Sequence, residues 1–194
     1  MIEAVVFDLD GVLRHFDRSA EAALEERHGM EPGALLTAAF GDELGQRLIV
    51  GEIDWPEFTD RLAERIGMAA VQEFMELRAV LDHAAIEVLE RLRHSGTTVA
   101  LLTNGTLRTE SELVEHGIVD SFDRIFNTAR LGVAKPHPDV FERVTSELAR
   151  PATSIGFVDD REDNVEAAVA HGWTGHHYRS LEGVVDWLAS LGLL

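Results

Sequence analysis

Three short runs of apolar, largely β-branched residues each stop abruptly at polar residues, and this pattern constrains the fold more than any other feature. The runs are Ala4–Phe7, Thr98–Leu102 and Ile155–Val158. Each is hydrophobic and is followed by residues that favour turns, so we predict three buried strands. Helical patterns lie between and after these strands. Strands that alternate with helices predict an α/β fold with a doubly wound parallel sheet.

The helices outside the region 16–82 are predicted from apolar residues at helical spacing and from terminating residues. They cover Ala84–His94, Thr109–Gly117, Asp139–Leu148 with Pro138 in the first turn, Asn164–His171 and Leu181–Leu191. Thr109 and Glu112 have the spacing of a capping box.

The segment 16–82 breaks this alternation, because it contains only helical signals. The predicted helices are Ser19–His28, Pro32–Phe40, Glu43–Val50 and Trp55–Ile66. Asp54 and Glu57 would cap the last of them. We therefore predict a small helical bundle, residues 16–82, inserted into a core domain formed by residues 1–15 and 83–194.

Charge and composition narrow the function. The chain has 35 acidic and 17 basic residues, a net charge of -18, and no cysteine. Such a charge repels phosphate backbones, so we expect no nucleic-acid partner and no anionic membrane surface. The absence of cysteine excludes disulfides and thiol chemistry. No apolar run is long enough to cross a bilayer, and the first ten residues do not resemble a signal peptide, so we expect a cytoplasmic protein.

Acidic residues follow two of the predicted strands. Ligands of an open parallel sheet bind outside the carboxyl ends of its strands. Asp8 and Asp10 follow the first strand, and residues two apart in a strand face the same side. Two carboxylates in one pocket repel each other, by about 4 kcal/mol at ~4 Å when the effective dielectric constant is near 20. With Asp159 and Asp160 after the third strand, the sequence predicts an all-oxygen site suited to Mg²⁺.

Lys135 is the only lysine among the 17 basic residues. Where a flexible point charge is not needed this sequence uses arginine, so we expect Lys135 to have a chemical role. Pro136 biases it towards an extended loop near the same sheet edge. The alternative is an ordinary surface lysine, just as each acidic pair, taken alone, could be a solvated turn or a helix cap.

Four ordered motifs resemble those of the haloacid dehalogenase-like hydrolases. They are DLDGVL at Asp8–Leu13, LLTNG at Leu101–Gly105, AKP at Ala134–Pro136 and FVDDRxxN at Phe157–Asn164. The match spans nearly the whole chain, and the helical insertion resembles the small α-helical cap of that superfamily. The double Asp followed by Asn164 is similar to the branch with sugar-phosphate phosphatases and the N-terminal phosphatase domain of soluble epoxide hydrolases.

The resemblance implies a phosphatase that uses an aspartyl-phosphate intermediate. Asp8 would attack phosphorus, and Asp10 would protonate the leaving alcohol and later take a proton from water. The Thr103 hydroxyl and the Asn104 backbone would hold phosphoryl oxygens. Lys135 would neutralise charge on the phosphate and the nucleophile. The expected substrate is a small phosphorylated metabolite, with sugar phosphates among the candidates.

The resemblance also implies a Mg²⁺ ion, because a carboxylate needs positive charge nearby to approach a phosphate. Its ligands would be the Asp8 carboxylate, the Asp10 backbone carbonyl and Asp160. Asp159 would either bind the metal or support its ligands. Asn164 would contact these ligands without touching the metal.

Other reactions of the same superfamily fit less well. Dehalogenases do not need an acid at the position of Asp10, and phosphonatases use a cap lysine that this chain lacks. Sugar phosphomutases carry Thr and His where this sequence has Phe16 and Ala20. A receiver-type phosphoacceptor would have its acidic pair first and its lysine last, the reverse of this order. A non-catalytic binding module is the remaining alternative, and the oligomeric state stays open.

Four further residues could have either a functional or a structural role. Arg14 and His15 follow the first motif and either face substrate or have a hinge or surface role. Trp55 and Phe58 are expected in the core of the helical bundle rather than at the substrate.

Overall fold

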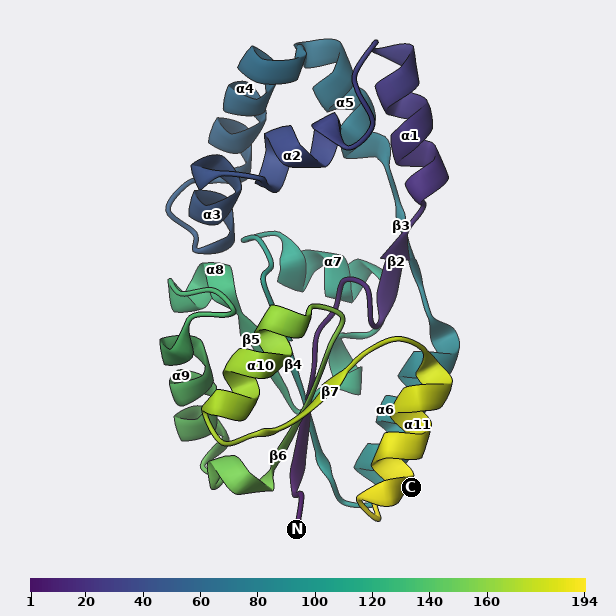
Figure 1. Ribbon diagram of the computed structural model, residues 1–194, viewed down its shortest axis with the longest axis vertical. Coiled ribbons are helices and arrows are strands. Elements are labelled where there is room, and N and C mark those ends of the chain that lie inside the picture. Colours follow the sequence, from purple (N-terminus) through teal and green to yellow (C-terminus); the bar gives the residue numbers. More distant parts are fainter.

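The computed structural model describes residues 1–194, and its centre is a five-stranded parallel sheet (Figure 1). The strand order is β5-β4-β1-β6-β7, with bounds β1 Ala4–Phe7, β4 Thr98–Thr103, β5 Arg124–Asn127, β6 Ile155–Asp159 and β7 Thr174–His177. The three central strands confirm the prediction. The two edge strands were not predicted, because their sequences RIFN and TGHH lack a continuous apolar run.

Helices cover both faces of this sheet, as predicted for a doubly wound fold. The helices and 3-10 turns of this part are α6 His83–His94, α7 Thr109–Glu115, η1 Val119–Ser121, α8 Thr128–Leu131, α9 Pro138–Leu148, η2 Ala152–Ser154, α10 Glu162–Ala170 and α11 Leu181–Ser190. Side chains alternate along β1, so Val5 and Phe7 pack with α6 and α11, while Val6 packs with α9 and α10. Two apolar cores therefore hold the central strands in place.

Five helices form a second group beyond the carboxyl edge of the sheet (Figure 1). They are α1 Arg18–Arg27, α2 Ala34–Phe40, α3 Glu43–Ile49, α4 Trp55–Ile66 and α5 Met68–Glu76. This group has apolar clusters of its own, one around Phe58 and Leu62 and a smaller one around Leu24 and Leu35. Helix α5 lies inside the segment 16–82 but was not among the helices predicted for it. No helix in the chain combines the length and apolar character that a bilayer crossing requires.

A short antiparallel ribbon joins the two groups. Its strands are β2 Arg14–Phe16 and β3 Ala79–Leu81, with His15 opposite Val80. This ribbon was not predicted, since strands of three residues are too short to show an alternating pattern. The boundaries predicted for the insertion, 16–82, fall at this ribbon.

The two predicted helix caps had different outcomes. The Asp54 side chain accepts a hydrogen bond from the Glu57 backbone N–H at 2.9 Å, so this cap is confirmed. The capping box of Thr109 and Glu112 is wrong. The Thr109 hydroxyl instead accepts the Thr106 backbone N–H at 2.9 Å and closes the turn after β4.

Candidate active site

The carboxyl edge of the sheet brings together the residues predicted from three strands. Asp8 directly follows β1, Thr103 ends β4 and Asp159 ends β6. All three are buried, with exposed fractions of 7%, 2% and 0%. Because these parallel strands are neighbours in the sheet, side chains far apart in sequence meet at one edge.

Lys135 lies between two of these carboxylates. Its Nζ is 2.8 Å from Asp8 Oδ1 and 2.7 Å from Asp159 Oδ2, and it donates to the Leu102 carbonyl oxygen at 2.8 Å. An ammonium group has three protons, so all of its donors have a partner. The side chain is 1% exposed. The alternative of an ordinary surface lysine is therefore wrong.

Asn104 fixes the backbone that carries this lysine. Its Oδ1 accepts the Lys135 N–H at 2.9 Å, and its Nδ2 donates to the Lys135 carbonyl oxygen at 2.9 Å. The side chain of Asn104 is thus occupied by protein contacts. The backbone of Asn104 is the part to which the resemblance assigns phosphoryl binding.

Both oxygens of the Asp159 carboxylate accept hydrogen bonds from the protein. Asn164 Nδ2 lies 3.0 and 3.1 Å from its two oxygens, and the Arg161 backbone N–H donates to Oδ1 at 2.9 Å. With Lys135 on Oδ2, both oxygens are engaged. Asn164 is buried at the start of α10, and its Oδ1 has no partner in the protein.

Three carboxylates are close enough to hold one metal ion. Asp8, Asp159 and Asp160 each offer an oxygen, and these oxygens lie within 4.8 Å of one another. Asp160 is exposed, and its side chain packs against Gly11. A Cβ on Gly11 would lie 2.3 Å from Asp160 Oδ2, and the φ of +87° at Gly11 also favours glycine. Hard oxygen donors at this spacing fit a small divalent cation.

The pKa values of this cluster reflect burial first and the neighbouring charges second. Burial raises the pKa of Asp8 to about 7, although the Lys135 ammonium opposes the shift. Partial burial of its carboxyl group, followed by the charge of Asp159, also raises the pKa of Asp160, although the residue as a whole is exposed. Burial alone would lower the pKa of Lys135, but the two carboxylates beside it outweigh burial and raise that pKa. One ammonium group therefore does not compensate the whole cluster, and a cation would.

Asp10 has a different environment from Asp8. Strand β1 ends at Phe7, so Asp8 and Asp10 both lie in the loop after it, where the charge of Asp10 still contributes to the raised pKa of Asp8. The Asp10 carboxylate forms two hydrogen bonds with Arg14. Arg14 Nε donates to Oδ1, and Arg14 Nη2 donates to Oδ2 at 3.2 Å. Arg14 Nη1 also donates to Glu112 Oε2 at 3.0 Å. Glu112 was not among the predicted site residues, and nothing local in the sequence indicates a partner 98 positions away.

The connection between α3 and α4 lies directly on the core near this site. The Arg108 guanidinium carbon is 4.8 Å from the centre of the Trp55 ring, and the Thr128 hydroxyl donates to the Ile49 carbonyl oxygen at 2.7 Å. Trp55 Nε1 is buried without a partner. Phe58 lies in the bundle core as predicted, whereas Trp55 contacts both that core and Arg108.

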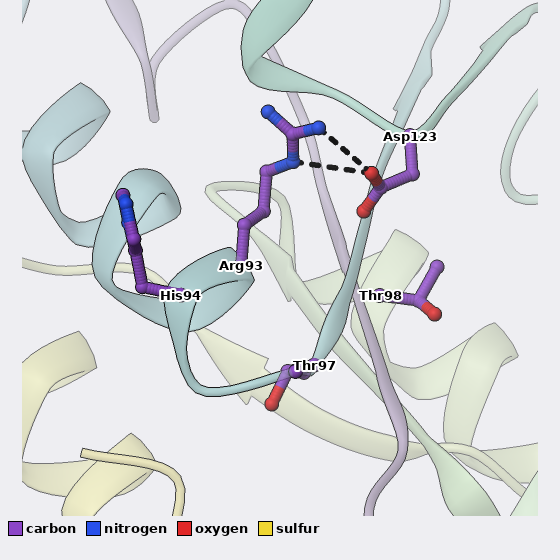
Figure 2. A pocket seen from close by; sticks show the side chains of 6 residues that line it. Arg93, His94, Thr97, Thr98 and Asp123 are labelled. Carbon is purple, nitrogen blue, oxygen red and sulfur yellow. Dashed lines mark hydrogen bonds and ion pairs between the residues drawn. The ribbon is translucent and has the colours of Figure 1, made fainter.

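A separate polar pocket of about 470 Å³ lies at the opposite edge of the sheet (Figure 2). It surrounds the start of β4 at Thr98, and Arg93 pairs with Asp123 on its wall. None of the predicted site residues lines this pocket.

Comparison with known proteins shows the family of this chain. Residues 2–172 match the family model described as haloacid dehalogenase-like hydrolase. Phosphatase MT3486 of Mycobacterium tuberculosis is 29% identical, over all of this chain and 96% of its own length.

Two solved structures share the fold. A predicted HAD-like family hydrolase from Porphyromonas gingivalis has a TM-score of 0.81, with 21% identity over 98% of both chains. A HAD family enzyme from Bacteroides thetaiotaomicron, in complex with magnesium and inorganic phosphate, has a TM-score of 0.76, with 23% identity over 93% of this chain and 96% of that chain. The family match covers most of the chain. The chain belongs to the haloacid dehalogenase-like hydrolases.

Proposed function

We propose that the chain is a Mg²⁺-dependent phosphatase that hydrolyses a small phosphorylated metabolite through an aspartyl-phosphate on Asp8. The observation that carries this proposal is the Asp8 carboxylate, buried at a sheet edge with Lys135 on one oxygen and Asp160 nearby. Two relatives support it: one is named a phosphatase, and the other was crystallised with magnesium and inorganic phosphate.

The residues that would hold the metal are the Asp8 and Asp160 carboxylates and the Asp10 backbone carbonyl. Asp159 belongs to the same acidic cluster, but both of its oxygens already accept hydrogen bonds from the protein. We therefore assign Asp159 the role of holding Lys135 in place. Asn164, which donates hydrogen bonds to Asp159, would hold Asp159 in turn. When bound, Mg²⁺ supplies the positive charge that lets a carboxylate approach a phosphate dianion.

The chemistry divides between two carboxyl groups. An Asp8 oxygen attacks phosphorus, and the bond to the ester oxygen breaks while Asp10 gives that oxygen its proton. Asp10 then takes a proton from the water that attacks the aspartyl-phosphate, and this releases phosphate and restores Asp8. The Thr103 hydroxyl and the Asn104 N–H donate to the phosphoryl oxygens, and Lys135 keeps Asp8 oriented.

The helices α1 to α5 act as a cap that selects the substrate. The α3–α4 connection contacts the core through Trp55 and Arg108, close to the loop that follows β4. Trp55 Nε1 is a buried donor without a partner, and such a group favours a ligand that accepts its hydrogen bond. A hinge at the β2–β3 ribbon would let this cap open and close over the site.

Phosphate release from a panel of esters tests the proposal. The panel contains sugar phosphates, polyol phosphates, phosphoglycolate, nucleotides and 4-nitrophenyl phosphate, each assayed with Mg²⁺ and with EDTA. We expect Mg²⁺-dependent release from some members and none from the Asp8→Asn variant. Absence of release from every ester, or equal release in EDTA, would contradict the proposal. Release of halide from 2-haloacids would instead favour the dehalogenase reaction.

A further inference from the structure

Arg14 is a buried cation to which the mechanism above gives no role. Its side chain is 10% exposed and contacts two carboxylates, Asp10 and Glu112. Burial alone would lower its pKa, but the hydrogen bonds to Asp10 and Glu112 outweigh burial and raise it. The guanidinium therefore stays charged, and its side-chain hydrogen bonds go to the carboxylates of Asp10 and Glu112.

The contact fixes the plane of the Asp10 carboxylate. Nε and Nη2 of Arg14 each donate to a different oxygen, which is the fork arrangement that arginine forms with carboxylates. A carboxylate has about four lone-pair sites, so a fork leaves about two of them free. The Asp10 side chain is 41% exposed. Asp10 is thus oriented on one side and open to a reacting group on the other.

Two further contacts keep Arg14 itself in place. The Gly11 N–H donates to the Arg14 carbonyl oxygen at 2.8 Å, and the Arg14 N–H donates to the Leu9 carbonyl oxygen at 3.0 Å. These bonds close the backbone around Asp10. Glu112 on α7 holds the remaining guanidinium nitrogen at 3.0 Å. Backbone and side chain of Arg14 are therefore anchored separately.

We propose that Arg14 is the positioning residue for Asp10, and that Glu112 braces it. The inference rests on the proposed phosphatase function. Arg14 holds the Asp10 carboxyl group where it gives its proton to the ester oxygen as the bond from phosphorus to that oxygen breaks and the bond to Asp8 forms. Because Arg14 contacts neither Asp8 nor Lys135, its loss acts through proton transfer and not through phosphate binding.

Leaving-group dependence separates these roles. Arg14→Gln and Arg14→Lys are compared, in the wild-type and Asp10→Asn backgrounds, on 4-nitrophenyl phosphate and on the best alkyl phosphate of the ester panel. Nitrophenolate leaves without a proton, whereas an alkoxide needs one. We expect Arg14→Gln to lower kcat/KM for the alkyl ester by about tenfold or more, and for the nitrophenyl ester by less than about threefold. Arg14→Lys should recover part of the loss, and neither change should matter in the Asp10→Asn background.

The matched control is Arg93→Gln. Arg93 forms a similar pair with Asp123, at 3.1 and 2.9 Å, at the far edge of the sheet (Figure 2). This variant should leave both esters unchanged. If Arg14→Gln does not fold, Glu112→Gln replaces it, because this variant keeps the pair of Arg14 and Asp10. It should also lower kcat/KM more for the alkyl ester than for the nitrophenyl ester, but by a smaller factor than Arg14→Gln.

Three results would overturn the inference: an equal loss for both esters, a further loss in the Asp10→Asn background, or a gain in activity. If the wild-type protein hydrolyses no ester at all, the proposed function itself fails, and that outcome is distinct from each of these three.

Discussion

Replacing the nucleophile should stabilise the metal-free protein. Asp8 shares a buried site with Asp159 and a single ammonium group, so the site carries one excess negative charge when both carboxyls are ionised. Asp8→Asn removes that charge and keeps an oxygen for Lys135. Burial of charge at a functional site commonly lowers stability in this way. We therefore expect the variant to unfold at a higher temperature than the wild type at pH 8 in EDTA.

The pKa of Asp8 sets the size of the effect. It rises from 3.8 to about 7 on folding. A raised pKa means that the folded state binds more protons than the unfolded state between these values, so wild-type stability falls as pH rises through that window. About 3 units at about 1.4 kcal/mol each give a cost of about 4 kcal/mol above pH 7. At pH 5.5 the cost is smaller by about 2 kcal/mol.

Thermal unfolding of both proteins at pH 5.5 and pH 8, in EDTA, measures this difference. In a chain of 194 residues, about 2 kcal/mol corresponds to roughly 4–8 °C in Tm. The Tm advantage of Asp8→Asn should be larger at pH 8 than at pH 5.5 by this amount. A variant less stable than the wild type at pH 8, or an advantage that does not change with pH, would refute the reasoning.

Three further predictions concern the metal and the cap. Ca²⁺ should inhibit, because it takes about six to eight ligands at about 2.3–2.6 Å and would draw both oxygens of the nucleophile into coordination; full activity with Ca²⁺ alone would count against the proposed metal site. Gly11→Ala should weaken Mg²⁺ activation by about tenfold or more, since its methyl group would displace Asp160, whereas Gly29→Ala, at similar φ but in open space, should leave Mg²⁺ activation unchanged when both are titrated. Trp55→Phe and Arg108→Gln should reorder kcat/KM across the ester panel, and a uniform change would contradict a specificity role for the cap.

The central fold and most of the site could be predicted, because they depend on local signals that a parallel sheet combines. Apolar runs mark the buried strands, and the polar residues after them necessarily meet at one edge. Asp8, Thr103 and Asp159 are brought together for this reason, and Lys135 joins them from the loop.

The remaining features depend on tertiary contacts that leave no local pattern. The edge strands β5 and β7 have few apolar residues, and the β2–β3 ribbon forms only when two segments more than 60 residues apart in the sequence pair with each other. The pairing of Arg14 with both Asp10 and Glu112 requires α7 to reach the first loop. The clamp of Asn104 on Lys135 likewise appears only when β4 and the lysine loop are adjacent.

Trapping the covalent intermediate tests the central claim most directly. Asp10→Asn slows the attack of water, so the aspartyl-phosphate should accumulate on this variant when 4-nitrophenyl phosphate is added. After an acid quench and tryptic digestion, mass spectrometry should find one phosphoryl group on the peptide Met1–Arg14, lost on treatment with hydroxylamine. The same peptide from Asp8→Asn should carry none. A wild-type enzyme that turns over this ester while Asp10→Asn yields no phosphorylated peptide, or a phosphorylated peptide that persists in Asp8→Asn, would contradict nucleophilic catalysis by Asp8.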